Sequence, residues 1–491
     1  MAMTESQVKQ AMAEPAPPRL RHRILQAGGW AGAGFVLDKV IAAIQLMVVA
    51  RLLTPADFGV MAASATIVLA FMTISELGLE SALIAKAEVD REDLAVAWTV
   101  SIARGVAMAV CLWAAADLIG QAMQMPQLAS LLRVHAWLLV LQGLRSPAMA
   151  ILLKNLDLRR RVSIDLVRRV IEAGAIIALA LWLRTVWALL LGQLIGMCVG
   201  SLLSFWVAPF RPRLSLYRPA RNYFLRYGKH LNLTTLCIFG VMGGGELVIG
   251  RILGQDALGL YQIALAIPIM IGMRAMSVIT QISLPTYAFL QQDRPGVIRA
   301  LTVQMSLTGM LVIPSALGTM LLAPHIVTLL FGPSWTGAVE PLRILCLFAM
   351  CAAFCSVMAA LHCGADHPHL QTKIWALMCG AYVATAIPFT MAWGLSGAAW
   401  ALGLTFLVGL ALHVKATVDL LGSAAWPAFT PLKWAGFLVG VVAIGFGISN
   451  VVPSTFMGQW LVEISGVVGA AFYGRHLWVR EYPWLRELWG P

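Results

Sequence analysis

The sequence predicts an all-α integral membrane protein with about 14 transmembrane helices. Three observations support this prediction: hydrophobic residues make up 60% of the 491 residues, charged residues make up only 12%, and the mean hydropathy is +0.81. A water-soluble protein of this length would need more charged residues to cover its surface. Most of the chain should therefore lie in a lipid bilayer, which a helix of about 20 apolar residues can cross.

Apolar stretches of suitable length occur fourteen times along the chain. A helix enclosed in a bundle tolerates a few polar residues, so these stretches need not be free of charge. The connections between them are mostly short, so consecutive helices should run antiparallel, with no separate soluble domain. The predicted spans are residues 29–50, 59–84, 94–118, 128–153, 162–183, 186–209, 230–251, 259–284, 298–322, 338–361, 370–392, 396–418, 431–451 and 457–475.

Lysine and arginine residues are distributed unequally between the two sides of the predicted bundle. With a cytoplasmic N-terminus, 24 of the 35 lie in cytoplasmic loops and tails, and only Arg51, Arg184 and Arg251 lie on the opposite side. Because cytoplasmic loops of membrane proteins are enriched in Lys and Arg, we predict that both termini are cytoplasmic. The net charge of +12 then reflects membrane topology beside anionic lipid, and no nucleic-acid partner is expected.

The N-terminal segment and the eight cysteines indicate neither a cleaved signal nor a metal or redox site. Residues 1–27 lack the apolar core and cleavage site of a removable signal peptide, so the first hydrophobic helix should act as the insertion signal. The cysteines form no Cys-x-x-Cys pair, and most lie in apolar runs. We expect all eight to be small buried hydrophobic residues, and we expect neither a metal nor a cofactor.

One short phrase occurs twice, 200 residues apart. The stretch VVARLLTPADFGV at 48–60 matches VIGRILGQDALGL at 248–260, with an arginine and a glycine at equivalent positions. Each copy ends one predicted span and begins the next, so spans 1–6 and 7–12 should be two copies of a six-helix unit. Six is an even number, so both copies enter from the same side and the repeat is parallel, as in transporters with two lobes around a central cavity.

The repeat divides the chain into five predicted regions. Two of them are the six-helix lobes, and a stretch rich in arginine connects the lobes on the cytoplasmic side. The regions are a cytoplasmic tail (1–28), the N-terminal lobe (29–209), the basic linker (210–229), the C-terminal lobe (230–420), and an accessory helix pair with the C-terminal tail (421–491).

Several cations lie inside the predicted spans, where a charge needs a partner or a cavity. Those of the first lobe lie about 9–15 Å from the cytoplasmic edge, at a rise of 1.5 Å per residue. Arginine forks and lysine ammonium groups suit a diphosphate, so we predict a cationic belt that binds one. The alternative is internal pairing with Asp38, Glu76, Asp165 and Glu172, above all for Arg168 and Arg169. The candidate belt residues are Lys39, Arg104, Arg145, Arg168, Arg169 and Arg274.

Acidic residues inside the spans are candidates for ion coupling or for the cavity wall. Glu246 follows three consecutive glycines near the outer end of span 7 and could bind a proton or Na⁺. The alternative is a water-exposed acid near the membrane surface. The complete set of candidate acids is Asp38, Glu76, Glu172 and Glu246.

Four stretches resemble the polysaccharide and lipid-linked oligosaccharide flippases of the multidrug/oligosaccharidyl-lipid/polysaccharide exporter (MOP) superfamily. They are ARLLTPADFGVMAAS (50–64), SELGLESALI (75–84), LKNLDLRRR (153–161) and VIGRILGQDALGLYQIA (248–264). Many family members have Asn-x-Asp before the second arginine phrase, whereas this chain has GGGELVIGR with Glu246.

The resemblance implies twelve core helices and an accessory pair in the bacterial inner membrane. It also implies that an undecaprenyl-diphosphate-linked oligosaccharide, such as an exopolysaccharide or O-antigen repeat unit, moves to the periplasmic leaflet. The implied partners are this lipid-linked substrate, membrane lipids, and the polysaccharide polymerase and export machinery.

Other functions remain open at this stage. An enzyme would need an exposed catalytic loop, and the outer loops contain almost no acids or histidines, so we do not expect an enzyme. The histidines of HCGADHPH (362–369) are not at ligand spacing and lie on the cytoplasmic side. A multidrug cation antiporter should have an acidic or aromatic cavity rather than a basic one. A peptidoglycan-precursor flippase of the same fold is a further alternative.

Overall fold

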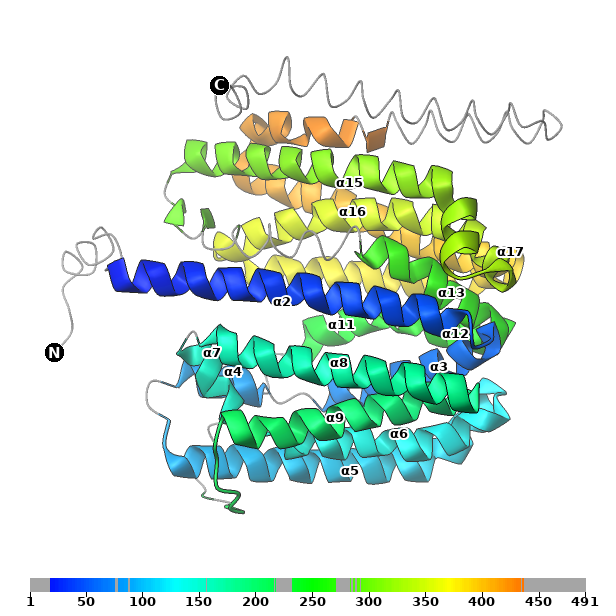
Figure 1. Ribbon diagram of the computed structural model, residues 1–491. Coiled ribbons are helices and arrows are strands. Elements are labelled where there is room, and N and C mark those ends of the chain that lie inside the picture. Colours follow the sequence, from blue (N-terminus) through cyan, green and yellow to red (C-terminus); the bar gives the residue numbers. More distant parts are fainter. Residues whose placement is uncertain are drawn as a thin grey trace.

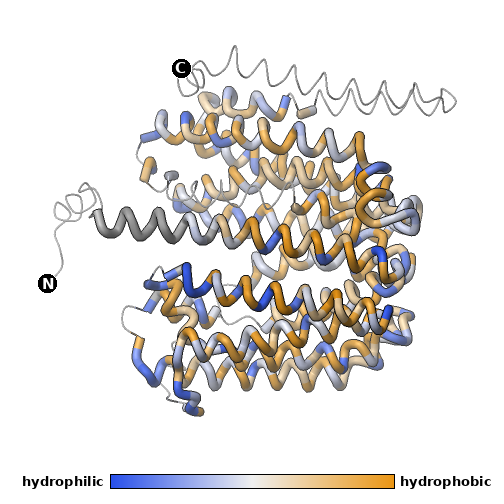
Figure 2. Tube along the Cα trace, viewed as in Figure 1, coloured by the Kyte–Doolittle hydropathy of each residue, from blue (hydrophilic) through white to orange (hydrophobic). Residues whose placement is uncertain are grey.

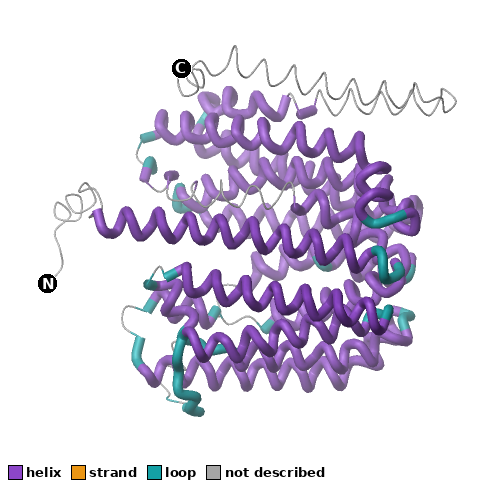
Figure 3. The backbone as a smooth tube through the Cα atoms, viewed as in Figure 1, coloured by secondary structure: helices purple, strands orange, loops and turns teal. Residues whose placement is uncertain are grey.

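The computed structural model describes residues 18–436 apart from 76–77, 87–88, 156, 216, 218–231, 271–282, 284–285, 288, 292 and 434. These residues form helices joined by short turns, and none of them forms a strand (Figure 3). The long helices lie side by side in two groups, called here the first lobe and the second lobe, and α2 lies on the side of the first lobe that faces the second (Figure 1). The hydropathy colouring is mostly apolar along the helices, with hydrophilic positions inside α2 and α8 (Figure 2).

The first lobe contains α2 to α9. Helix α2 packs along α8, and α5 with α6 and α8 with α9 form the other closely packed pairs. The elements are α2 (Pro18–Ala50), α3 (Pro55–Ile74), α4 (Leu79–Ala85), α5 (Arg91–Met123), α6 (Pro126–Leu144), α7 (Met149–Lys154), α8 (Leu158–Leu183) and α9 (Trp187–Val207).

The second lobe contains the elements from α11 to η3. Its most buried helix is α16, which packs between α15 and α17. The elements are α11 (Asn232–Met242), α12 (Gly244–Leu253), α13 (Gln255–Pro268), α15 (Arg294–Leu330), η2 (Pro333–Ala338), α16 (Val339–Gly364), α17 (Pro368–Leu421) and η3 (Ser423–Phe429).

The helix count agrees with two lobes of six. Within the described residues, nine helices are long and apolar enough to cross a membrane. One of them, α17, holds two predicted spans joined at Trp393 and Gly394, whose backbones leave helical geometry. Helix α8 is too highly charged to be among the nine, and α13 has only 14 described residues. Including these gives twelve, while predicted spans 13 and 14 lie almost wholly outside the described residues.

Two predicted spans of the first lobe are interrupted, which sequence periodicity did not indicate. Span 59–84 divides into α3 and α4, with Gly78 in the left-handed region at φ 57°. Span 128–153 divides into α6 and α7 around Pro147, because a proline disfavours helical geometry in the residue before it. Arg145 is consequently not inside a helix but at the C-cap of α6, with an extended backbone (φ −58°, ψ 143°).

The repeated phrase marks the place where the two lobes meet. Helices α3 and α13 begin there and form the main contact between the lobes. A Cβ atom on Gly59 would overlap the carbonyl oxygen of Gln255, and one on Gly259 would overlap that of Pro55. Each copy therefore needs its glycine because the backbone of the other copy lies against it. We call this side of the molecule the crossing end, and the opposite side, where α2 and α8 begin, the basic end.

Further contacts close the crossing end. The Trp335 indole Nε1 donates to the Ala50 carbonyl over 2.8 Å, and its ring meets Phe58 edge to face at 5.1 Å. Arg51 donates to the Leu329 carbonyl at the end of α15. Thr54 caps α3 in a capping box with Asp57. The ends of α2, α3, α13 and α15 are thereby fastened together, with η2 between them.

The cysteine prediction is only partly correct. Cys346, Cys351 and Cys355 are buried in α16 as expected, but Cys111, Cys198 and Cys363 are exposed. A weakly polar thiol is tolerated on a helix face that lies against lipid as well as in a core, so an apolar run does not separate the two environments.

Replacement of Gly59 by valine should destabilise the protein. The added side chain must push the backbone of α13 away, and overpacking of this kind costs about 1–3 kcal/mol. The measurement is the melting temperature of the purified protein in detergent. Gly318→Val in α15 is the matched control, because a Cβ atom there meets nothing within 4 Å. Equal melting temperatures for the two variants would show that α3 and α13 are not in close contact at Gly59.

Candidate functional site

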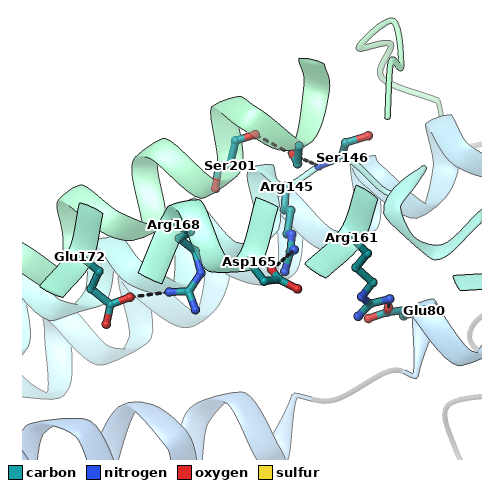
Figure 4. A network of polar contacts seen from close by, with 9 residues as sticks. Glu80, Arg145, Ser146, Arg161, Asp165, Arg168, Glu172 and Ser201 are labelled. Carbon is teal, nitrogen blue, oxygen red and sulfur yellow. Dashed lines mark hydrogen bonds and ion pairs between the residues drawn. The ribbon is translucent and has the colours of Figure 1, made fainter. Parts of the chain in front are cut away.

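Charged residues form one stripe along α8. Arg161, Asp165, Arg168 and Glu172 follow one another at intervals of three or four residues and therefore share a helix face. Figure 4 shows their side chains, together with Arg145, pointing to the same side of the helix. The stripe begins near the basic end and continues into the membrane-spanning part of α8.

Helix α9 is shaped to accept this stripe. Gly192, Gly196 and Gly200 lie four residues apart, and a Cβ atom on the latter two would collide with the side chains of Glu172 and Arg168, respectively. The missing side chains let the two helices approach closely and pack the aliphatic stems of Glu172 and Arg168 against α9.

The break between α6 and α7 is held in place by α9. The Ser146 amide donates to the Ser204 hydroxyl over 2.9 Å, and the Ser146 hydroxyl donates to the Ala208 carbonyl over 3.0 Å. Ser201 donates to the Leu141 carbonyl over 2.9 Å. These bonds fix the extended backbone that presents the Arg145 side chain to α8.

Arg145 forms an ion pair with Asp165 at the edge of a cavity of about 210 Å³. The Arg145 Nη2 to Asp165 Oδ1 distance is 2.8 Å, and the side chains are 34% and 41% exposed. Among the described residues, the Arg145 Nε group has no hydrogen-bond partner, so the carboxylate engages only part of the guanidinium.

Two further arginines line the same cavity. Arg161 pairs with Glu80 of α4 over 2.6 Å, and Arg104 of α5 donates to the Ser75 carbonyl at the end of α3 over 3.2 Å. Arg104 makes no ion pair with a described carboxylate. Together with Asp165 and Glu80, the three arginines leave one net positive charge around the cavity, which we call the arginine cavity.

A second, more buried cluster lies deeper along α8. Glu172 accepts hydrogen bonds from Arg168 and Arg169, over 2.5 and 2.8 Å, and its side chain is only 9% exposed. Asp38 of α2 lies 3.6 Å from Arg169 and also pairs with Lys39. This cluster ties α2 to α8, and its three cations and two carboxylates leave one net positive charge.

The structure thus divides the predicted belt into two groups. Arg104 and Arg145 line one cavity, together with Arg161, which the sequence assigned to a basic loop. Lys39, Arg168 and Arg169 form ion pairs with Asp38 and Glu172. For these three cations, the structure therefore shows the internal pairing that was the alternative to the belt. Asp165 pairs with Arg145 rather than with its neighbours on α8. Arg274 and Glu76 lie outside the described residues.

Glu246 lies at the contact between the lobes. It lies in the first turn of α12, is partly buried, and accepts a hydrogen bond from the Thr66 hydroxyl of α3. The alternative of a water-exposed acid at the membrane surface does not describe this environment. In the part of the chain that the structure describes, no three metal-binding side chains gather at one place. His362 is buried and bonds to Thr417 over 3.0 Å, so it has a structural partner.

Comparison with known proteins gives concordant matches. A family model described as polysaccharide biosynthesis protein matches residues 48–340. The lipopolysaccharide biosynthesis protein WzxC of Escherichia coli K12 is 25% identical over 338 residues, 67% of this chain and 68% of that protein. The succinoglycan biosynthesis transport protein ExoT of Rhizobium meliloti 1021 is 24% identical over 304 residues, 62% of each chain.

Two solved structures have the same fold. The lipid II flippase MurJ in an inward closed conformation matches with a TM-score of 0.72 at 12% identity, over 94% of this chain and 99% of that one. An inward-facing multidrug resistance MATE family transporter of the MOP superfamily matches with a TM-score of 0.63 at 16% identity, over 79% and 95%.

Replacement of Glu172 by alanine should lower the amount of folded protein. It leaves Arg168 and Arg169 without their shared carboxylate in a poorly hydrated place, which costs about 3–5 kcal/mol for a buried pair. Asp117→Ala is the control, because its pair with Arg133 is largely exposed and such pairs contribute about 0–1 kcal/mol. The measurements are a membrane immunoblot and the melting temperature. Equal values for the two variants would contradict a structural role for Glu172.

Proposed function

Because the chain belongs to the polysaccharide biosynthesis protein family of the MOP superfamily, we propose that it is a flippase for a lipid-linked oligosaccharide. The substrate would be an undecaprenyl-diphosphate-linked repeat unit of an exopolysaccharide or O-antigen. It would move from the cytoplasmic to the periplasmic leaflet of the bacterial inner membrane, which this multi-pass protein spans. The proposal describes a transporter, not an enzyme.

The observation that carries this proposal is the arginine cavity. Arg104, Arg145 and Arg161 come from three different helices or helix ends and converge on one space. Guanidinium groups bind phosphate oxygens through paired N–H donors, and a diphosphate offers several acceptors. Ser101, Gln142 and Ser146 add uncharged polar groups to the wall.

The position of the cavity suits entry from the cytoplasmic leaflet. It lies toward the basic end, which we propose to be cytoplasmic because Lys and Arg are concentrated there. The lobes are fastened at the opposite, crossing end through Gly59 and Gly259. A two-lobed protein closed at one end supports alternating access, in which the lobes rock about a central site.

Two alternatives are weaker. A multidrug cation antiporter would need a site attractive to cations, whereas the arginine cavity repels them. A peptidoglycan-precursor flippase shares the diphosphate chemistry, and the MurJ match establishes the fold only, so the family match favours the polysaccharide substrate.

We also propose that export is coupled to a proton or Na⁺, with Glu246 as the candidate group. The polymerase and export machinery are proposed partners.

Replacement of Arg145 by alanine should abolish or sharply reduce glycan export without loss of the protein from the membrane. Loss of a charge-assisted contact to the diphosphate costs about 1.5–3 kcal/mol, or roughly 10- to 150-fold in affinity. Arg104→Ala should act in the same direction, and Arg145→Lys should retain part of the activity because the charge remains. The measurement is complementation of an export-deficient strain, beside a membrane immunoblot.

The matched control for this series is Arg133→Ala, which removes an arginine paired with Asp117 on α5, away from the cavity. It should export normally. Normal export by the Arg104→Ala/Arg145→Ala double variant would exclude the arginine cavity as the substrate site.

The orientation can be tested with single cysteines in a cysteine-free background. Cysteine at the exposed position Arg213 should react with a membrane-impermeant maleimide only after the inner membrane is opened. Cysteine at Thr185, in the turn between α8 and α9, should react in cells whose outer membrane alone is permeable. The reverse pattern would place the basic end in the periplasm and overturn the direction of transport.

A further inference from the structure

We propose that Asp165 and Glu80 are exchange ligands: they hold Arg145 and Arg161 in this structure, and the substrate diphosphate displaces them. This inference rests on the proposed function and deepens it, because it assigns a role to the acids of the arginine cavity. The two carboxylates would decide which anions enter the site, and they would help the headgroup to leave by pairing again with the arginines.

The exposure of the pairs supports exchange. Asp165 is 41% exposed and Glu80 is 53% exposed, so neither carboxylate is enclosed by the protein and each can move away from its arginine. Glu172, on the same stripe of α8, is almost fully covered and bonds two arginines at once. The face of α8 thus takes part in a permanent ion cluster around Glu172. One to three turns nearer the basic end, it takes part in two ion pairs that can be replaced, Arg145–Asp165 and Arg161–Glu80.

The geometry of the Arg145 pair is also incomplete. Asp165 takes a hydrogen bond from Nη2, while the Nε group of the same guanidinium has no acceptor in the part of the chain that the structure describes. A phosphate group has more acceptor oxygens than a carboxylate and can engage both N–H groups of a guanidinium edge. Displacement therefore replaces a partial interaction by a fuller one, provided that Arg145 turns slightly toward the cavity.

The charge balance explains why a diphosphate would be favoured over a smaller anion. With both acids in place, the described residues give the cavity only one net positive charge. A singly charged anion that displaces a carboxylate gains little binding free energy, because the ion pair that it forms with the arginine only replaces the ion pair that it breaks. A diphosphate brings two or three negative charges and can bind Arg104 together with Arg145 or Arg161, so it replaces two weak pairs by a shared and stronger set.

The test measures anion binding to the purified full-length protein by calorimetry, with inorganic pyrophosphate and inorganic phosphate as probes. Asp165→Asn removes the competing charge and keeps the shape of the side chain. We expect it to bind pyrophosphate about 5- to 10-fold more tightly than the wild type, since a competing pair and a nearby like charge are both lost. Phosphate binding should tighten at least as much, so selectivity for pyrophosphate should not rise.

Glu80→Gln is the second variant and should tighten binding in the same direction, which keeps the test decisive if Asp165→Asn folds poorly. Asp117→Asn is the matched control, because it neutralises an ion-paired aspartate on α5 outside the cavity, and its affinities should equal those of the wild type. Unchanged or weaker pyrophosphate binding by Asp165→Asn and Glu80→Gln, at normal melting temperature, would overturn the exchange proposal.

Failure of the exchange proposal is distinguishable from failure of the proposed function. If the wild type binds pyrophosphate and Arg145→Ala loses it, but neither acid variant tightens binding, only the exchange role is wrong. If the wild type binds no pyrophosphate and Arg145→Ala exports normally, the arginine cavity is not the substrate site and both proposals fall.

Discussion

A charge inside a hydrocarbon layer needs a partner or water, and this constraint determines the architecture of the first lobe. Helix α8 brings seven charged residues from its first turn to Glu172. The glycines of α9 let it pack closely despite them, α2 supplies Asp38, and α4 supplies Glu80. The break between α6 and α7 places Arg145 opposite Asp165, where an uninterrupted helix would have continued past it. Several irregularities of this lobe are thus responses to the same electrostatic requirement.

The two lobes share a backbone plan but not a chemistry. Gly59 and Gly259 are equivalent because each must admit the backbone of the other copy, a purely steric need that acts equally on both. Their neighbours Arg51 and Arg251 are both exposed, and Arg51 donates to carbonyls at the end of α15, whereas Arg251 lies in the last turn of α12. The ion pairs of the described residues all lie in the first lobe, whereas the described part of the second lobe buries a hydrogen bond between His362 and Thr417.

The features that the sequence predicted correctly are those encoded locally. Helical spans follow from runs of apolar residues, and the Arg168–Glu172 pair follows from a spacing of four residues on one helix. The two interrupted spans were missed, since a proline or glycine inside a membrane helix is often tolerated without a break. Arg145–Asp165, Arg161–Glu80 and Arg169–Asp38 join different helices. Such pairs depend on how far each helix is rotated and shifted against its neighbour, which no spacing in the sequence encodes.

The asymmetry between the lobes has a consequence for transport under the proposed function. The described cations of the arginine cavity all belong to the first lobe, so a diphosphate bound there need not exchange its ion pairs when the lobes rock against each other. Transfer of a dianion through hydrocarbon is costly, and it is least costly when the charge stays in one polar niche that moves as a unit. The packing surface of the second lobe is mostly neutral. This lobe would then open or close the way to the niche without binding the diphosphate itself. Release would depend on the groups that compete for the same arginines, which are the exposed carboxylates Asp165 and Glu80 within the niche itself.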